Sequence, residues 1–185
     1  MIAVVPSEKL PIAQARVLDP GAWDQLFRRY QLPLYSFLFE LVRQEQTALD
    51  LVQETFISAA KHIQTLSDDS KFGSWLFSIA HQKCAKLWRK PNREEPMDSE
   101  TIEEWIDDIP SPDAWLVHQE STEALYAALE TLPASHRSVI MLHFLEDFSL
   151  QDIASITQTP VGTVKSRLHY AKRSLRHRLE GKNDL

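Results

Sequence analysis

The chain has little cysteine, little glycine and no long apolar run, and each shortage excludes a class of protein. Cys84 is the single cysteine in 185 residues, so one copy can form neither an internal disulfide nor a cysteine zinc site. With four glycines and no segment near 18 consecutive apolar residues, neither a glycine-rich phosphate loop nor a membrane-spanning helix is expected. The opening residues also lack the basic start and apolar run of a signal peptide. We therefore expect a cytoplasmic protein with no membrane insertion and no cofactor.

Helical patterns dominate what is present. Apolar residues make up 43% of the chain, which is enough for one ordinary domain or two small ones. Few glycines and little β-branched alternation favour helices over strands. We predict an all-α fold of two small helical domains joined by an acidic flexible linker. The expected parts are an N-terminal extension over 1–19, a first domain over 20–91, the linker over 92–115, a second domain over 116–181 and a tail over 182–185.

The first helical pattern follows a predicted turn at Asp19-Pro20-Gly21. Pro33 lies inside the pattern and should bend or interrupt the helix, because proline removes a backbone donor. The apolar residues recur at helical spacing and are expected in a core rather than in a cofactor site. They are Trp23, Leu26, Phe27, Tyr30, Leu34, Phe37, Leu38, Leu41 and Val42.

A second helix is predicted to open at Thr47, where Asp50 completes a capping box. Its expected buried positions are Leu49, Val52, Phe56, Ala59 or Ala60, and Ile63. Helical spacing places Asp50, Gln53 and Glu54 together on the opposite, exposed face. That face could receive a basic or amide-rich partner helix, although an acidic patch alone is more often only solvated surface.

A polar loop over 67–71 leads into a predicted helix over 72–90 that interleaves aromatic and basic residues. Rings can stack on unpaired bases while cations follow the backbone, so this helix suits unpaired nucleic acid. The apolar members are equally explained as core: Phe72, Trp75, Leu76 and Ile79. That explanation is weaker for the cations Lys83, Lys86 and Arg89.

Residues 91–115 differ in character from the segments on either side. They hold four prolines, and eight acidic residues lie between Glu94 and Asp108. This composition predicts a tether between two domains. The tether could be a plain solubilising spacer, or it could imitate nucleic acid within a basic channel.

The segment from Ser149 to Leu179 predicts a helix, a tight turn and a second helix. Ser149 and Asp152 form a capping box before the stripe Leu150, Ile153 and Ile156. After a polar break over 157–159, Thr159 is expected to cap the second helix, with Pro160 at its first position. The inward residues of the second helix are Val164, Leu168, Ala171 and Leu175. Such a pair matches the helix-turn-helix unit, whose second helix reads the DNA major groove.

Charge is concentrated on that second helix. Residues 160–180 contain six Lys or Arg and one Glu, although the whole chain carries a formal charge of −6. A local basic block in an acidic protein favours a polyanionic partner. The alternative is an amphipathic hairpin with a solvated basic face.

Three segments carry a resemblance to a known family. They are DLVQETF at 50–56, FGSWLFSIAHQ at 72–82 and LPASHRSVIMLHFLEDFSLQDIASITQTPVGTVKSRLHYAKRSL at 132–175. In order and spacing across an acidic linker, they resemble the extracytoplasmic-function (ECF) group of bacterial sigma factors, over about residues 20–181. The resemblance implies a sigma-2 helical bundle and a sigma-4 helix-turn-helix domain. Its implied partners are core RNA polymerase, promoter DNA and an anti-sigma factor that would cover both binding surfaces.

The same resemblance implies site residues. Docking on the clamp helices of the largest catalytic polymerase subunit would use Asp50, Gln53 and Glu54. Opening of the minus-10 element and capture of a flipped base would use Ser70, Lys71, Phe72, Trp75, Gln82, Lys83, Lys86 and Arg89. Contacts to the minus-35 element in the major groove would use Thr163, Lys165, Ser166, Arg167, His169, Tyr170 and Arg173. The linker would lead toward the RNA exit channel.

Three positions depart from the family pattern. Members often carry Asn where this chain has Gln82, an acidic residue where it has Lys86, and Arg where it has Tyr170. Promoter opening and one minus-35 contact, at Tyr170, are therefore expected to depart from those of the family. The implied polymerase-binding residues are intact.

Other functions remain as alternatives. A stand-alone helix-turn-helix regulator would form a stable dimer and bind an operator with two-fold symmetry. Catalysis is not expected, because His81 and Cys84 lie one helical turn apart without a third orienting group. A metal site is not expected either, since the histidines lack ligand spacing. These scattered histidines are His62, His118, His136 and His143.

Overall fold

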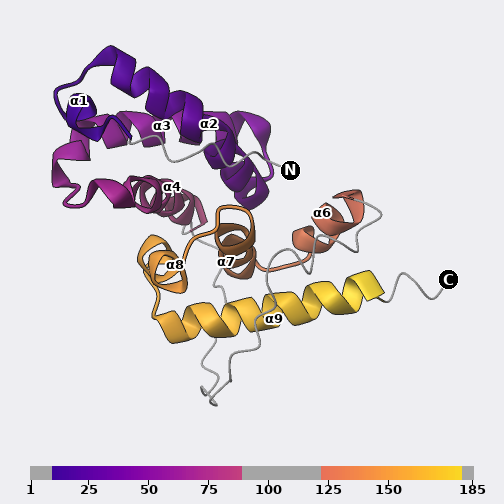
Figure 1. The fold of residues 1–185 in the computed structure, drawn as a ribbon. Helices are drawn as coiled ribbons and strands as arrows, with labels where there is room; N and C mark the ends of the chain where they lie inside the picture. The colour runs from indigo at the N-terminus through magenta and orange to yellow at the C-terminus, as the bar shows by residue number, and fades with distance from the viewer. Residues whose placement is uncertain (1–9, 89–121, 181–185) are drawn as a thin grey trace. The chain divides into compact units, whose positions relative to one another are not determined.

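The structure, a computed structural model, describes residues 10–88 and 122–180, and the regular elements within them are helices (Figure 1). The chain divides into two compact units, Met1–Cys84 and Ala85–Leu185, here the N-terminal unit and the C-terminal unit. The predicted all-α fold is confirmed. No helix in the described part has the length and apolar content needed to cross a bilayer. The predicted acidic linker lies outside the described residues.

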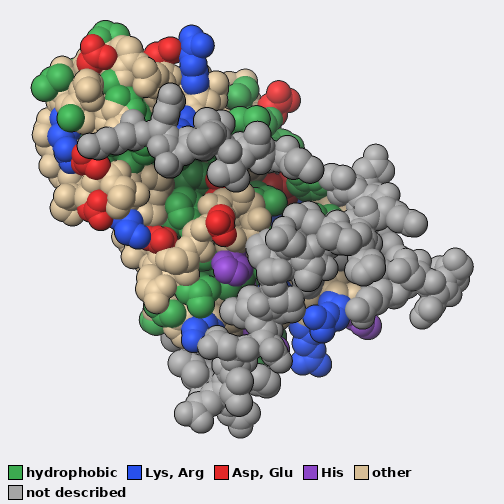
Figure 2. Space-filling view, in the orientation of Figure 1, with side chains coloured by type: hydrophobic (Ala, Val, Ile, Leu, Met, Phe, Trp, Pro, Cys, Tyr) green, Lys and Arg blue, Asp and Glu red, His purple; other side chains and the backbone are tan. Residues whose placement is uncertain are grey.

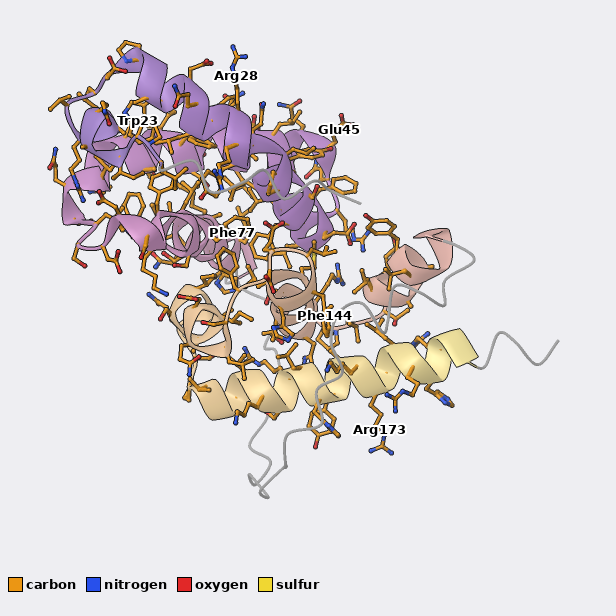
Figure 3. The ribbon with its side chains drawn as sticks, viewed as in Figure 1. Trp23, Arg28, Glu45, Phe77, Phe144 and Arg173 are labelled. Carbon is orange, nitrogen blue, oxygen red and sulfur yellow. The ribbon has the colours of Figure 1, made fainter. Side chains whose placement is uncertain are left out.

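The described part of the N-terminal unit has three long helices and three short ones, and the last long helix continues past Cys84. They are α1 (Ile12–Arg16), α2 (Pro20–Val42), α3 (Glu45–His62), the 3₁₀ turns η1 (Ile63–Thr65) and η2 (Asp69–Lys71), and α4 (Phe72–Trp88). Phe37 of α2 and Phe77 of α4 are both fully buried, and their ring centroids lie 5.4 Å apart. Figure 3 labels Phe77 among the side chains of this interior. Burial of such rings is the main stabilising term of a small helical domain.

The start and middle of α2 differ from the sequence-based expectation. Asp19, predicted in a turn, is instead the N-cap of α2, and its Oδ1 accepts a 2.7 Å hydrogen bond from the Ala22 amide. Pro33 was predicted to bend or interrupt the helix; it does not interrupt α2, which continues through it. Proline removes one backbone hydrogen bond. The neighbouring Leu34 and Phe37 are fully buried, and this packing offsets the loss.

The start of α3 also differs. The helix begins at Glu45 rather than Thr47, and Gln44 at its N-cap makes no side-chain capping bond. Thr47 Oγ1 donates to Gln44 Oε1 at 2.6 Å, so its hydroxyl is not used as the predicted cap. Leu49, predicted as core, is 40% exposed, whereas Leu51 is buried. The buried stripe is Ala48, Leu51, Val52, Thr55, Phe56 and Ala59.

The C-terminal unit contains four described helices. They are α6 (Thr122–Glu130), α7 (Ala134–Phe144), α8 (Leu150–Thr157) and α9 (Val161–Glu180), and α9 packs against each of the other three. The predicted inward stripe of α9 is confirmed, since Val164, Leu168, Ala171 and Leu175 are all buried. Arg137 of α7 is buried too, and its Nη2 donates to the Leu132 carbonyl at 2.8 Å, which ties down the turn after α6.

The α8–α9 turn follows the predicted pattern with one exception. The Ser149 hydroxyl accepts from the Asp152 amide at 3.1 Å and donates to Asp152 Oδ2 at 2.6 Å, so the predicted cap is confirmed. Gln158 ends α8 in the left-handed region with φ of 53°. Thr159 does not cap α9, because its hydroxyl is paired with that of Thr157 at 2.8 Å. The carbonyl of Pro160 accepts from the Val164 amide, so proline immediately precedes the helix instead of opening it.

Candidate nucleic-acid interface and protein-binding face

The outer face of α9 is polar near its start and cationic further on. Lys165, His169, Tyr170 and Arg173 are exposed, and the other predicted reading residues, Thr163, Ser166 and Arg167, are half-buried. Arg173 projects from α9 away from the helix axis (Figure 3). Recognition helices place polar side chains on base edges and flanking cations on phosphates. All seven predicted minus-35 residues therefore lie on α9, four of them exposed and three half-buried.

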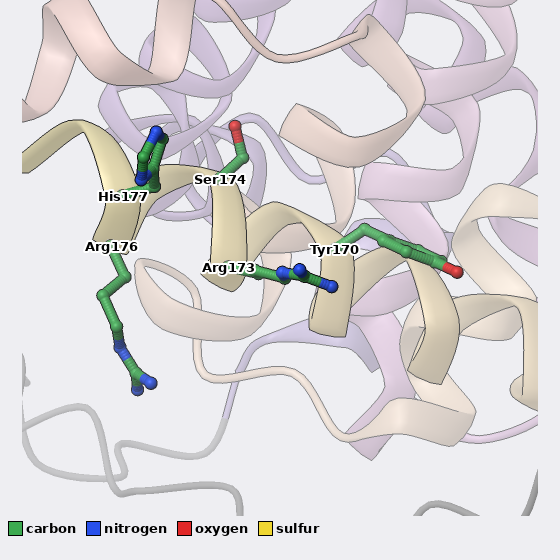
Figure 4. Close-up of a pocket in the computed structure, with 5 residues that line it drawn as sticks. All are labelled: Tyr170, Arg173, Ser174, Arg176 and His177. Carbon is green, nitrogen blue, oxygen red and sulfur yellow. The ribbon is translucent and has the colours of Figure 1, made fainter.

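The C-terminal half of α9 also borders a surface hollow of about 560 Å³ (Figure 4). Its lining residues are Tyr170, Arg173, Ser174, Arg176 and His177. Nearby, Lys172 lies 5.1 Å from the centre of the Phe144 ring. Partial burial, and secondarily Arg176, lowers the pKa of Lys172. The described residues that line the hollow all belong to α9, and two of them are arginines.

The acidic face of α3 is exposed, as predicted, at Asp50, Gln53 and Glu54. The side chain of Asp50 accepts from Gln46 Nε2 at 3.0 Å, one turn earlier in the same helix. Glu54 pairs with Lys83 of α4 at 3.2 Å, with side-chain exposures of 60% and 20%. Sequence reasoning placed Glu54 and Lys83 in two different sites and missed this pair, because the contact joins residues 29 positions apart.

Charged side chains elsewhere on the N-terminal unit are of both signs. Figure 2 shows acidic and basic groups interspersed over the visible face of this unit. Asp24 and Arg28 illustrate the ordinary case, since they form a 2.8 Å pair within α2 and are well exposed. Such exposed pairs contribute about 0–1 kcal/mol. The visible face of the unit is therefore not uniformly acidic. Asp50, Gln53 and Glu54 stand out because they lie together on one face of α3.

The loop before α4 has a defined shape. Asp68 Oδ1 accepts from the Ser70 amide at 2.9 Å and from the Ser70 hydroxyl at 2.7 Å. These hydrogen bonds lower the pKa of Asp68, so its carboxylate stays ionised. Ser70 and Lys71 are exposed at the end of this loop. The loop thus exposes polar side chains, and these hydrogen bonds order its backbone.

The predicted minus-10 residues divide into three groups. Ser70, Lys71, Gln82 and Lys86 are exposed, and Trp75 and Lys83 are half-buried. Phe72 is fully buried beside Tyr30, with ring centroids 5.5 Å apart, so it belongs to the core and would have to leave it to touch DNA. Arg89 lies outside the described residues.

Cys84 is a packing residue. It is fully buried, and this desolvation raises the pKa of its thiol to about 12. A thiol that stays protonated is a poor nucleophile and a poor metal ligand. No group of three or more His, Cys, Asp or Glu within 10–88 and 122–180 is arranged to hold a metal ion.

Comparison with known proteins agrees with this arrangement. Residues 26–94 match the family described as Sigma-70 region 2, and residues 122–175 match Sigma-70, region 4. The RNA polymerase sigma-H factor of Pseudomonas aeruginosa is 30% identical over 165 residues, covering 85% of this chain and 86% of that protein. The RNA polymerase sigma factor SigV of Bacillus subtilis is 33% identical over 151 residues, covering 82% and 86%.

A solved structure with the same fold is that of the sigma factor RpoE of Bartonella quintana in complex with the anti-sigma factor NepR. It superimposes with a TM-score of 0.65 at 26% identity and covers 85% of this chain and 96% of that one. The helical bundle, the helix-turn-helix and these matches define a transcription initiation factor. The chain belongs to the ECF group of the sigma-70 family of RNA polymerase sigma factors.

Proposed function

We propose that this sigma factor binds core RNA polymerase through the acidic face of α3. The observation that carries the proposal is the common exposure of Asp50, Gln53 and Glu54 on one side of that helix. Their carboxylates and amide can accept and donate hydrogen bonds to a basic or amide-rich helix of the polymerase. Glu54 would exchange its weak, solvent-screened pair with Lys83 for a partner on the polymerase.

Promoter recognition would then use two sites on the chain. The loop over 67–71 and the exposed side of α4 would bind the opened minus-10 element, with Ser70, Lys71, Gln82 and Lys86 available to bases and phosphates. Lys83 would join them once Glu54 has docked. Single-stranded DNA is held by such combinations of cations and rings, and Trp75 supplies a half-buried ring.

The minus-35 element would be read by α9 in the major groove. A bidentate contact between a side chain and a base discriminates by about 1–3 kcal/mol, so one helix gives only modest specificity. Two weak sites on one chain add up when a tether raises the effective concentration of the second. The net charge of −6 opposes binding of DNA by the isolated chain, so polymerase contacts would be needed for tight binding.

Regulation is proposed from the relatives. The RpoE structure holds an anti-sigma factor. We infer that a protein of that class inhibits this chain by covering the acidic face of α3 and the DNA-binding face of α9. This regulation, like the action on polymerase, would take place in the cytoplasm.

The test is run-off transcription with purified core RNA polymerase on fragments of the source genome. The wild-type protein should direct promoter-specific transcripts, and Asp50→Ala, Glu54→Ala should reduce them by about tenfold to a hundredfold, the effect of losing two charged interface contacts. The protein alone should leave no footprint on the same fragments at physiological salt.

The matched control is Asp24→Ala, Glu45→Ala, which removes two exposed carboxylates outside the tested face, one from α2 and one from the first turn of α3. It should transcribe like the wild type. Equal loss in both double variants would show that net charge, rather than the α3 face, is responsible. A symmetric footprint by the protein alone, without transcripts, would instead support a stand-alone regulator.

A further inference from the structure

The short helix α1, which precedes the residues that match Sigma-70 region 2, contacts the loop before α4. Arg16 at the end of α1 donates from Nη2 to the Leu66 carbonyl at 2.8 Å and to Asp69 Oδ1 at 2.7 Å. In return, Gln64 Nε2 donates to the Arg16 carbonyl at 2.8 Å. These three contacts join positions 48 to 53 residues apart, and Arg16 lies outside the matched range 26–94.

The helix that carries Arg16, α1, is held in place by packing and by hydrogen bonds. Ile12 and Ala15 are buried, and Trp23 Nε1 donates to the Ala15 carbonyl at 3.0 Å. The connection to α2 is closed by Leu18, which has a φ of 61° and donates its amide to the Ala15 carbonyl. A non-glycine residue with this conformation persists only where its surroundings determine it. The position of Arg16 is thus set by packing before it meets the loop.

The loop itself is exposed and lies between two buried residues. Leu66 at one end and Phe72 at the other are buried, but every residue over 67–71 is exposed. Within the loop, the Asp68 carboxylate accepts from Ser70, and the Asp68 carbonyl accepts from the Lys71 amide at 3.0 Å. Arg16 supplies a long-range contact to this loop, since it holds both the Leu66 carbonyl at the start of the loop and Asp69 at its middle.

We propose that Arg16 is a positioning residue for promoter opening, which sets the shape in which the loop over 67–71 receives an unpaired base. This inference rests on the proposed minus-10 role of that loop. The contact is partly exposed, with side-chain exposures of 26% for Arg16 and 50% for Asp69. An ion pair of this kind adds little to global stability. Its loss should therefore loosen the loop while the rest of the unit stays folded.

The contact can be broken from either side. Arg16→Met removes both hydrogen bonds, and Asp69→Asn removes only the ion pair. Arg28→Met is the matched control, because Arg28 forms an exposed pair with Asp24 inside α2 and projects away from the unit (Figure 3). Arg16→Lys keeps the charge but cannot present two donors in the same fixed geometry.

The first measurement is amide hydrogen exchange of the free, full-length protein. Arg16→Met should speed exchange over residues 66–71 by about tenfold, the change expected when a hydrogen-bonded contact is lost. Asp69→Asn should act in the same direction, and Arg28→Met should leave this segment unchanged. Combining Arg16→Met with Asp69→Asn should add little beyond Arg16→Met alone, because both disrupt one contact.

The second measurement is transcription by polymerase reconstituted with each variant on a promoter library randomised at the minus-10 element. Arg16→Met should weaken the base preference there and leave the affinity for core polymerase unchanged. A general stability defect would lower transcription from all templates equally and would lower polymerase affinity as well. Arg16→Lys should give an intermediate base preference.

The outcomes separate the inference from the function on which it rests. Unchanged exchange over 66–71, or an unchanged base preference beside faster exchange, would overturn the role of Arg16 while wild-type transcription still supports the proposed function. A wild-type protein that directs no promoter-specific transcripts would overturn the proposed function and the inference together.

Discussion

In the N-terminal unit the candidate DNA-binding loop is held by contacts between residues 48 to 53 positions apart, through Arg16, Gln64, Leu66 and Asp69. In the C-terminal unit the turn that presents α9 is held by contacts within five positions, such as Thr159 with Ala154 and Thr157 with Thr159. The second arrangement can form as soon as its own segment folds. The first requires the helices of its unit to be packed, so its shape can respond to changes elsewhere in that unit.

The largest effect on this contrast between the two units is expected from removing a buried aromatic ring. Phe77→Ala should lower the stability of the N-terminal unit by about 3–5 kcal/mol, because it leaves a cavity beside Phe37. Hydrogen exchange resolved by peptide should show lost protection in α1–α4, including the loop over 67–71. The C-terminal helices α8 and α9 should keep theirs, since they pack on a core of their own.

Leu168→Ala is the corresponding change in the C-terminal unit, where Leu168 is buried. It should lower the stability of the C-terminal unit alone, by about 2–5 kcal/mol. Hydrogen-exchange protection should then be lost in the C-terminal helices and kept in the N-terminal ones. Equal loss of protection in both units with either variant would mean that the two unfold as one, and the contrast between them would disappear.

A smaller effect on stability is expected from the ionisation of Glu146, which follows α7 in the C-terminal unit. Burial raises the pKa of its carboxyl to about 7, from an ordinary value of 4.5. The unfolded chain therefore ionises this group at lower pH than the folded chain, so stability falls as pH rises from about 4.5 to about 7 and stays low above that.

Glu146→Gln should remove this pH-dependent loss. At pH 8 the variant should be more stable than the wild type by up to about 3 kcal/mol, and near pH 4 the ionisation contribution should be absent. Urea unfolding of the C-terminal unit at pH 4, 6 and 8 measures the difference. A stability difference that does not change with pH would show that Glu146 has an ordinary pKa.

The smallest test compares two sequence-predicted helix caps. Ser149→Ala removes the hydroxyl that accepts from the Asp152 amide, and should lower stability by about 1 kcal/mol. Thr47→Ala removes a hydroxyl that bonds only to the Gln44 side chain, so stability should change little or rise slightly, since alanine favours helices. Thermal unfolding of both variants gives the comparison. A larger loss from Thr47→Ala would indicate that it caps α3 in solution.

The C-terminal unit was the more predictable of the two from sequence. The capping box at Ser149, the buried stripe from Val164 to Leu175 and the exposed cationic face of α9 all follow from periodicity. Only the detail of the α9 start was wrong, because Thr159 bonds to Thr157 instead of the helix amides. In the N-terminal unit, periodicity correctly predicted the exposure of Asp50, Gln53 and Glu54.

The sequence by itself determined the long helices, the order of the two domains, and which residues share a face, because capping and side-chain spacing act within one or two turns. Only the tertiary structure decided that α2 continues through Pro33, that Phe72 is inside the core, and that Lys83 pairs with Glu54. It also brought Arg16 to Asp69. These outcomes depend on how separate helices pack, and spacing along one helix carries no information about the partner that a side chain meets on another.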